Sequence, residues 1–469
     1  MNILLYPIII PVVFGIFCFV VPKKLRGIAL IGSLITFALT IYMFFQGPLS
    51  LVKDGSLIFR LDNLSRFILM ASTLFGVLIV LYSFKFMERF TRISEYYAYT
   101  LWTVSFACGA ILSNSLVWLL IFWTLLAITL FLLIDIGGPE ARRAAKKTLI
   151  IVGGSDVVMI LGVGALWIIT KKLQMDEINV PVTGGLTMVA FLCLAITAFT
   201  KAGAMPFHTW IPDCAEKAPI PVTAFLPASV DKLLGIYLLA RIALDLFVLN
   251  RAASLVLLIV GSVTIVGAVL FAIIQHDFKV LLSYHAVSQV GYMVLGIGTG
   301  NPIGIAGGIF HMLNHAIYKG CLFLCGGAVE HRVGTTQLKK LGGLARKMPI
   351  TLITCVISAL AISGIPPMNG FVSKWMVFQG CAILGQNGDK LWLIWLLAAV
   401  LGSALTLFSF MKFIHGTFFG SKEKEEFKDV KEVNFTMWIP MVVLALLCIV
   451  FGIFAFQFPL KYFIGPAIR

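Results

Sequence analysis

The sequence predicts an all-α integral membrane protein with about 14 transmembrane helices. First, 60% of its 469 residues are hydrophobic and only 12% are charged, and the mean hydropathy is +1.00. Soluble domains have roughly a quarter of their residues charged. Second, the apolar residues fall into successive runs, each close to the roughly 20 residues that span a bilayer. Third, Gly and Pro interrupt the seventh and twelfth of these runs. The runs cover residues 3–21, 27–45, 64–84, 96–112, 115–134, 145–170, 186–204, 220–248, 253–275, 278–298, 303–328, 350–379, 391–419 and 435–457.

The loops predict the orientation of the chain. Loops after odd-numbered helices hold most of the loop lysines and arginines, as in the segment 142–147. Because basic loops stay in the cytoplasm, we expect a multi-pass protein of the cell (cytoplasmic) membrane with both termini on the outer face. Residues 51–63 alternate in polarity and predict a short strand or hairpin on that face. The first run lacks a signal-peptide cleavage pattern, so we expect it to be a mature helix.

The nine cysteines do not indicate a redox or metal centre. None forms a C-x-x-C pair, and nearly all lie inside apolar runs, where cysteine behaves as a small apolar residue. Iron–sulfur, zinc and haem attachment patterns are therefore absent from the sequence. We expect no cofactor and no metal, and the net charge of +15 reflects basic loops rather than nucleic-acid binding.

Two lysines stand in or beside the apolar runs of residues 186–248. Lys201 ends the seventh run, next to a break formed by Gly203 and Pro206, and Lys232 lies in the middle of the eighth run after Asp231. A lysine can reach the membrane interface when it lies near a helix end, but Lys232 is too central for that. Ionisable groups at bilayer depth usually mark an ion or proton path, and this is the favoured interpretation of both lysines.

The eleventh run reads FHMLNHAIYKGCLF and carries His311, His315 and Lys319 at intervals of four. Residues at this spacing lie along one face of a helix. Two histidines four residues apart can bind a metal, and buried histidines can also be purely structural. A metal site is disfavoured because no third ligand is evident and Lys319 would repel a cation. We favour a proton relay, because imidazole passes protons between its two nitrogens near neutral pH.

The twelfth run repeats the design of the seventh. It reads ISALAISGIPPMNGFVSKW, with a break at Gly364, Pro366 and Pro367 and with Lys374 just beyond it. Corresponding broken helices in two halves of a chain indicate an inverted-repeat transporter. We therefore expect two inverted five-helix repeats, helices 4–8 and 9–13. The predicted units are residues 1–95 (helices 1–3), 96–248 (first repeat), 249–420 (second repeat) and 421–469 (a cytoplasmic connector and helix 14).

Five further polar residues are accessory candidates for the path. His208 and Asp231 belong to the stretch around the first break, and His285 lies among the polar residues of the tenth run. Asp135 and Asp156 flank or enter the sixth helix and could equally be ordinary helix-end residues. The set is Asp135, Asp156, His208, Asp231 and His285.

Several segments together resemble the antiporter-like membrane subunits of respiratory complex I, group 4 membrane-bound hydrogenases and Mrp-type cation/proton antiporters. The matching segments are KAGAMPFHTWIPDCAEKAPIPVTAFLPASVDKLLGIYLLAR, DFKVLLSYHAVSQVGYMVLGIG, FHMLNHAIYKGCLFLCGGAV and LGGLARKMPITLITCVISALAISGIPPMNGFVSKW. The resemblance implies fourteen helices with two inverted repeats and broken helices 7 and 12.

The resemblance also assigns roles to individual residues. It implies that Lys201 is the central lysine of helix 7, that Lys232 is the next lysine inward, and that Lys374 is the exit-side lysine. His311, His315 and Lys319 would link the two half-channels. The family carries a glutamate after a tryptophan in helix 5, but here the segment reads IFWTLLAITLF and Thr124 stands in its place. Asp135 and Asp156 are candidate substitutes.

These observations lead to one main functional hypothesis and three alternatives. The main one is a proton-translocating subunit, with Na⁺ as an alternative ion, of a redox-driven membrane complex. Its expected partners are homologous antiporter-like subunits and a peripheral redox arm, within the lipid bilayer and without nucleic acid. The alternatives are a non-translocating structural or coupling subunit, a module of a cation/proton antiporter, or a part of an inorganic-carbon uptake system. The chain is not expected to be an enzyme on its own.

Overall fold

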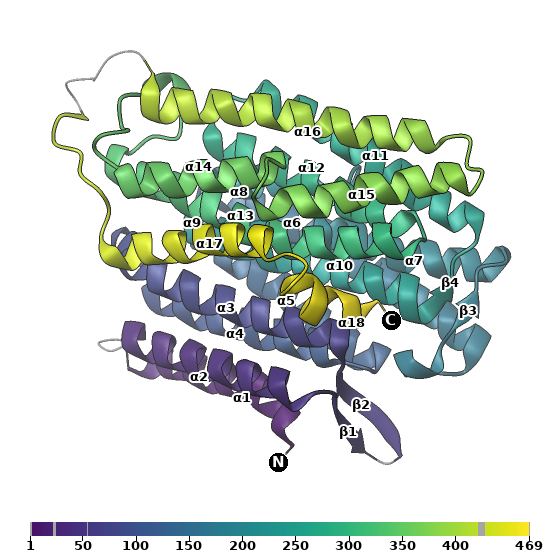
Figure 1. Ribbon diagram of the computed structural model, residues 1–469. Helices are drawn as coiled ribbons and strands as arrows, with labels where there is room; N and C mark the ends of the chain where they lie inside the picture. The colour runs from purple at the N-terminus through teal and green to yellow at the C-terminus, as the bar shows by residue number, and fades with distance from the viewer. Residues whose placement is uncertain (1, 22–24, 54, 421–426, 469) are drawn as a thin grey trace.

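The computed structural model describes residues 2–21, 25–53, 55–420 and 427–468. Long helices run side by side through the whole molecule, nearly parallel or antiparallel to one another (Figure 1). The first part of the predicted connector, 421–426, and four loop lysines used for the orientation (Lys23, Lys24, Lys422 and Lys424) lie outside the described residues.

The N-terminal helices are α1 (Tyr6–Val20), α2 (Leu25–Gln46) and α3 (Asn63–Phe86). The next group is α4 (Ile93–Leu112), α5 (Leu116–Asp135), α6 (Arg142–Thr170), α7 (Gly185–Ala202), α8 (Trp210–Lys217), α9 (Ile220–Phe225) and α10 (Asp231–Arg241). It is followed by α11 (Arg251–Ile273), α12 (Phe278–Gly298), α13 (Pro302–Val333), α14 (Pro349–Ser363), α15 (Asn369–Gln386) and α16 (Trp392–Ile414). The last helices are α17 (Phe435–Ile453) and the short α18 (Gly465–Ala467).

Within the described residues, eleven helical segments are long and apolar enough to cross a membrane. Helices α4 and α13 and the broken pair α14–α15 complete the predicted set of about fourteen membrane units. The backbone of such helices satisfies its own hydrogen bonds, which the hydrocarbon layer requires. The predicted fold class, an all-α membrane bundle with broken helices 7 and 12, is confirmed.

Four short strands form two small sheets at one end of the bundle (Figure 1). Strands β1 (Leu49–Lys53) and β2 (Ser56–Leu61) pair antiparallel, so the expected hairpin is confirmed. Strands β3 (Val180–Pro181) and β4 (Phe247–Val248) pair in parallel. Near both termini the chain contacts this region, since Asn2 donates to the carbonyl of Ser50 and Asn63 donates to that of Pro466. Both termini therefore lie at the end of the bundle that carries the hairpin.

Helix α13 lies at the centre of the second half, packed against α12, α14, α15 and α17. Almost every residue from Ala306 to Val329 on this helix is buried. The membrane-facing helices are different, because one side of α2, α6 and α16 exposes large apolar residues. A polar residue on α13 therefore cannot reach the lipid or the aqueous surface by a change of rotamer.

Candidate functional site: a buried series of lysines and histidines

Helix α7 ends inside the protein because Gly203 adopts a left-handed conformation with φ of +81°. Glycine is the residue that most readily takes this conformation at a helix C-terminus. A Cβ at this position would collide with the side chain of Ile211 and lie 3.0 Å from Nζ of Lys232. The chain re-enters a helix at Trp210, so the carbonyls of the last turn of α7 have no following helix to bond them.

Lys201 lies in that last turn and forms an ion pair with Asp231 of α10. The Nζ–Oδ1 distance is 3.3 Å, and both side chains are fully buried. The ammonium also stands 5.6 Å from the ring centre of Trp123 on α5, a distance at which the ring face attracts a cation. At low dielectric the attraction between such charges is much stronger than in water. The pair joins helix 7 to helix 8.

The local backbone before Asp231 is a π-helical segment, Leu226–Val230, between α9 and α10. Pro227 lies in this segment and has no N–H to donate, which disfavours a regular α-helix at that point. π-helical turns are often found at functional sites. This irregular turn ends where Asp231 and Lys232 begin, and the two side chains then point to different neighbours.

Lys232 donates a hydrogen bond to the carbonyl of Ala202, the residue that ends α7. Its Nζ lies 6.0 Å from the ring centre of Trp210, whose indole N–H donates to the carbonyl of Thr200 at 3.1 Å. The C-terminal end of a helix carries partial negative charge. The first break is therefore closed by an ammonium and an indole, which bind its free carbonyls.

The second break has the same design. Helix α14 ends at Gly364, which has a φ of +79°, and Nζ of Lys374 donates to the carbonyl of Ile362 at 2.8 Å and to Ser403 at 3.1 Å. Its ammonium lies 4.7 Å from the ring centre of Tyr292. Four membrane units, α9–α10, α11, α12 and α13, lie between α7 and α14, so the two broken helices run in opposite directions, as inverted repeats require.

Two groups on α13 lie between the breaks without a hydrogen-bond partner among the described residues. His315 has neither ring nitrogen bonded, and Nζ of Lys319 is likewise unbonded, although both side chains are completely buried. Buried polar groups are nearly always hydrogen-bonded, to protein or to ordered water. His315 and Lys319 lie four residues apart on one face of α13, and α13 packs against both α10 and α15.

His311 sits one turn earlier on α13 and is fully bonded. Its Nδ1 lies 2.9 Å from Oγ of Ser373, and its Nε2 lies 3.2 Å from both Oε1 of Gln289 and the hydroxyl of Tyr318. Ser373 immediately precedes Lys374, so His311 connects α13 to the second break. Sequence reasoning did not single out Ser373, Gln289 or Tyr318 as its partners, because these contacts arise from the packing of α12, α13 and α15.

His285 on α12 is a further completely buried histidine. Its Nε2 lies 2.7 Å from Oγ of Ser409 on α16, and α12 packs against both α13 and α15. The accessory candidate His285 is therefore buried next to the helices that carry Lys319 and Lys374. We call these groups the buried series: Lys201, Asp231, Lys232, His315, Lys319, His285 and Lys374, with His311. All of them are fully buried, and they belong to the two breaks and to α12 and α13.

The remaining accessory candidates lie in different places. Asp135 ends α5 in ion pairs with Arg92 and Arg142, 11 residues beyond Thr124 and so about 16 Å along the helix. Asp156 of α6 is buried, feels the charge of Lys201 and approaches Thr124. Thr124 itself faces outward and is exposed on the surface of the chain. His208 is half-buried and packs against Tyr284 with ring centres 6.2 Å apart.

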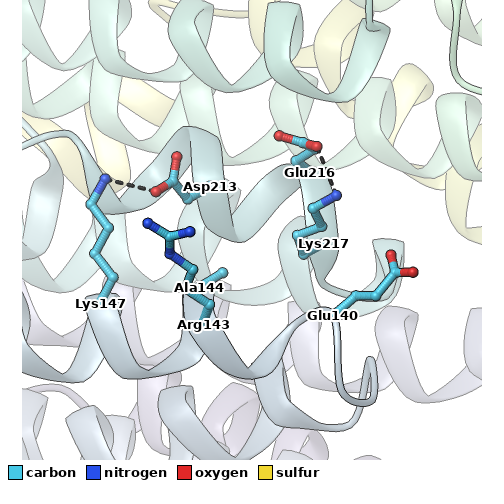
Figure 2. Close-up of a pocket in the computed structure, with 7 residues that line it drawn as sticks. All are labelled: Glu140, Arg143, Ala144, Lys147, Asp213, Glu216 and Lys217. Carbon is cyan, nitrogen blue, oxygen red and sulfur yellow. Dashed lines mark hydrogen bonds and ion pairs between the residues drawn. The ribbon is translucent and has the colours of Figure 1, made fainter.

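Two adjoining polar cavities open at the end of the bundle opposite the hairpin. Figure 2 shows the first, about 380 Å³, where Lys147 pairs with Asp213 and Lys217 pairs with Glu216. The second is about 630 Å³ and shares Glu140, Glu216 and Lys217 with the first. Its lining includes Lys279, which is buried and donates to the carbonyl of Ala218 at 3.1 Å.

Cys214 lies on the same helix as Asp213, Glu216 and Lys217, which line the first cavity. It is completely buried on α8, and both Lys279 and Asp231 are among the charges that act on it. The cavities are lined mainly by charged side chains, at the end of the bundle that carries the basic loop of Arg143 and Lys147.

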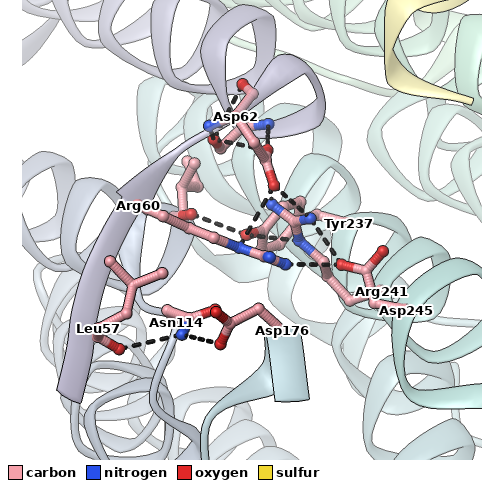
Figure 3. A network of polar contacts seen from close by, with 10 residues as sticks. Leu57, Arg60, Asp62, Asn114, Asp176, Tyr237, Arg241 and Asp245 are labelled. Atoms are coloured by element: carbon pink, nitrogen blue, oxygen red, sulfur yellow. Dashed lines mark hydrogen bonds and ion pairs between the residues drawn. The ribbon is translucent and has the colours of Figure 1, made fainter. Parts of the chain in front are cut away.

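At the hairpin end, an ion-pair network closes the bundle (Figure 3). Arg241, at the end of α10, bonds Asp62 and Asp245 at 2.7 Å each, and Arg60 of β2 bonds the same Asp245 at 2.7 Å. Burial disfavours the Asp62 carboxylate, but the guanidinium groups of Arg241 and Arg60 outweigh it and hold the pKa of Asp62 well below its usual range. The network fixes the hairpin to the helix that carries Asp231 and Lys232.

No group of three or more His, Cys, Asp or Glu side chains in the described part of the chain is arranged to hold a metal ion. Cys321 and Cys325 are 3.9 Å apart at sulfur on one helix face, and the free cysteines among the described residues are nearly all buried. The chemistry that the site offers is therefore that of amines, imidazoles and a few carboxylates, which bind and release protons.

Comparisons with known proteins place this geometry in a family. The sequence model described as "NADH:quinone oxidoreductase/Mrp antiporter, TM" matches residues 113–406. Subunit A1 of a Na⁺/H⁺ antiporter from Staphylococcus haemolyticus is 30% identical over 493 residues, which cover 97% of this chain and 61% of the relative. The Staphylococcus aureus subunit is 30% identical over 497 residues with the same coverage. The chain thus spans about three fifths of the length of these relatives.

Solved structures show the same fold. A chain of the Mrp complex from Dietzia sp. DQ12-45-1b superposes with a TM-score of 0.86 at 22% identity, covering 99% of this chain and 96% of that one. A chain of an archaeal membrane-bound sulfane sulfur reductase gives 0.87 at 24%, covering 98% and 97%. A chain of respiratory complex I from Thermus thermophilus gives 0.84 at 21%, covering 99% and 98%. The match over more than half of its length shows that this chain is an antiporter-like membrane subunit and belongs to the NADH:quinone oxidoreductase/Mrp antiporter family.

Proposed function

We propose that this subunit translocates protons along the buried series from Lys201 to Lys374. The observation that carries the proposal is the set of ammonium and imidazole groups that bridges two oppositely directed helix breaks with no exposed member. Charged groups at this depth are costly unless they are functional. His315 and Lys319 have no hydrogen-bond partner within the part of the chain that the structure describes, which leaves their nitrogens available to exchange protons with internal water.

Protons are favoured over Na⁺ by the chemistry of the series. A hard cation requires several oxygen ligands, usually carboxylates and carbonyls. Here the buried groups between the breaks are cationic or basic, and Asp231 is already paired with Lys201. A sodium ion at His315 or Lys319 would meet repulsion, whereas a proton is carried by these side chains themselves.

Asp231 takes the place of the missing helix-5 glutamate as the partner of Lys201. Thr124, at the position of that glutamate, has no charge and faces outward, whereas Asp231 contacts the ammonium directly. In the proposed cycle, protonation of Asp231 weakens its hold on Lys201. A shift of Lys201 in the last turn of α7 then alters the electrostatic potential at Lys232, which donates to the carbonyl of Ala202 in the same turn. This arrangement favours a translocating subunit over a purely structural one.

The polar cavities beside Lys279 are proposed as the approach from the cytoplasm. They lie at the end with the basic loops, such as that of Arg143 and Lys147, and basic loops remain cytoplasmic. The hairpin and both termini would then lie on the outer face. Residues 96–248 and 249–420 are the two units that each contain one break.

We further propose that the subunit works inside a larger complex with homologous antiporter-like subunits. The solved relatives come from multisubunit assemblies, namely the Mrp complex, the sulfane sulfur reductase and complex I. In a redox complex, a peripheral arm would supply the energy. An Mrp-type cation/proton antiporter is the second candidate, since the curated relatives are Na⁺/H⁺ antiporter subunits. The proteins that co-purify with the chain discriminate between the two.

The test is proton movement by the purified complex in proteoliposomes. Lys201→Ala and Lys232→Ala are each expected to abolish coupled proton movement, while Lys146→Ala, an exposed basic residue on α6, leaves it unchanged. Assembly is checked by co-purification of the partner subunits. Normal proton movement in assembled Lys232→Ala complex would refute the proposed path.

A further inference from the structure

An apolar cavity of about 170 Å³ lies apart from the proton series, between α2, α3, α13, α17 and the C-terminal segment. All twelve of its lining side chains are apolar: Phe37, Phe67, Met70, Ala71, Leu74, Phe75, Leu313, Ile317, Leu447, Phe451, Phe458 and Phe463. Such a cavity excludes water and accepts an apolar guest. Its volume is that of roughly six groups of water size, which is enough for a stretch of hydrocarbon chain.

The cavity is built into the membrane-embedded part of the protein. Helices α2, α3 and α17 are all long and apolar enough to cross a bilayer, and α2 and α17 expose large apolar residues such as Ile35 and Leu446. The opening of the cavity therefore faces the hydrocarbon layer of the membrane. Lining atoms without a neighbour lose their dispersion contacts, so occupancy by a lipid tail is favourable.

A cationic side chain stands at the hairpin end of the cavity. Arg66, near the start of α3, lies 5.3 Å from the ring centre of Phe44, whose ring contacts that of Phe463 in the cavity wall. Arg66 bonds Asn63 at 2.6 Å, but its buried Nε has no partner among the described residues. A guanidinium suits a phosphate group well, and Lys461 lies exposed on the neighbouring C-terminal segment.

We propose that this cavity is a binding site for a membrane glycerophospholipid, whose acyl chain fills the apolar space and whose phosphate binds Arg66. The cavity reaches the back of α13, where Leu313 and Ile317 lie on the same turns as Asn314 and His315 but point to another side. The lipid tail therefore supports the helix that carries the relay residues. This role is independent of which ion the subunit moves.

Photocrosslinking of the full complex in nanodiscs tests the site. The probe is phosphatidylglycerol with a diazirine on its acyl chain, and a diacylglycerol with the same diazirine chain, which has no phosphate, serves as the comparison. The expected labelling concentrates on peptides of α3, α13 and α17. Ala71→Trp, which fills the cavity, should reduce it at least fivefold, whereas Ile128→Trp on the exposed face of α5 should not change it.

Arg66→Gln tests the phosphate contact separately. It is expected to reduce labelling by the phospholipid probe and to leave labelling by the diacylglycerol, which has no anionic head group, unchanged. Labelling spread evenly over the lipid-facing helices of the unmodified protein would overturn the proposal, whether or not Ala71→Trp folds. Equal loss of both probes, or of neither, in Arg66→Gln would overturn the role of the phosphate.

Discussion

Lys201 and Asp231 form a completely buried ion pair that joins the broken seventh helix to the eighth, with 3.3 Å between Nζ and Oδ1. Breaking a buried pair by removing one partner costs about 3–5 kcal/mol, because it leaves an uncompensated charge, whereas replacing both partners by apolar residues is often neutral. The contribution of the pair to stability and its proposed role in proton movement can therefore be tested separately.

Asp231→Asn is expected to destabilise the protein by about 3 kcal/mol and to abolish proton movement. The double variant Lys201→Met with Asp231→Leu should recover most of the stability, since no charge is left unpaired, but none of the transport. Thermal unfolding in detergent and proton uptake by proteoliposomes measure the two effects. Recovery of transport in the double variant would show that the pair is only structural.

Thr124→Glu is expected to have little effect alone, because Lys201 already has a carboxylate partner. In the Asp231→Asn background it should restore part of the transport, since Thr124 adjoins Asp156 and lies on the helix of Trp123, which contacts Lys201. Ile128→Glu, one turn further along the exposed face of α5, is the matched control. Equal rescue by both glutamates would mean that general surface charge, rather than a partner for Lys201, is responsible.

The sequence predicts the helices, both breaks and the buried cations because these features are local. A run of apolar residues, a Gly/Pro interruption and a lysine within such a run are each visible without knowledge of the packing. The hairpin at residues 51–63 was likewise predicted from alternation over a few residues. The resemblance to the family added the expected order of the lysines.

Contacts between helices were beyond this reasoning. Asp231 was noted beside Lys232, but its pairing with Lys201, thirty positions earlier, depends on how α10 packs against α7 and on the π-helical turn at Leu226–Val230. The bonds from His311 to Gln289 and Ser373 depend in the same way on α12 and α15. Asp135 is a further example, because its local sequence does not reveal its ion pair with Arg92, 43 positions earlier.

The left-handed backbone conformation of the glycines at the two breaks can be tested by substitution. Gly203→Ala and Gly364→Ala place a Cβ on a left-handed residue, which costs roughly 1–2 kcal/mol. The added Cβ also approaches Lys232 at the first break and Lys374 at the second, each at 3.0 Å. Both variants should lose most of their proton movement because the lysines can no longer reach the free carbonyls.

Gly164→Ala is the control for these variants, since a Cβ there meets nothing within 4 Å on the helix α6. It should be neutral or slightly stabilising, by about 0.5–1 kcal/mol. Combining Gly203→Ala with Ile211→Ala removes the worst clash at the first break and should recover stability more than transport. Full activity of Gly203→Ala or Gly364→Ala would show that the breaks do not position the lysines.

Asp62 provides a prediction with a defined pH dependence. Arg241 and Arg60 lower the pKa of Asp62 in the folded protein, so the carboxylate stabilises the fold at any pH above its unfolded pKa of about 3.9. That contribution is lost only as the pH falls below this value towards the folded pKa. Asp62→Asn should therefore lower the free energy of unfolding by about 1–3 kcal/mol, equally at pH 7 and pH 5, and by less below pH 4.

The comparison with Glu177→Gln, whose side chain is 48% exposed in a weak 3.8 Å contact with Lys172, separates a local from a general charge effect. An exposed pair of this kind contributes at most about 1 kcal/mol, so this variant should unfold like the unmodified protein. Because Arg241 ends the helix that begins with Asp231, loss of Asp62 should also loosen α10 at the hairpin end of the bundle. The rate of hydrogen exchange should rise in β2 and α10 of Asp62→Asn and stay unchanged in α16. An equal change in all three elements would exclude a local anchoring role for the network.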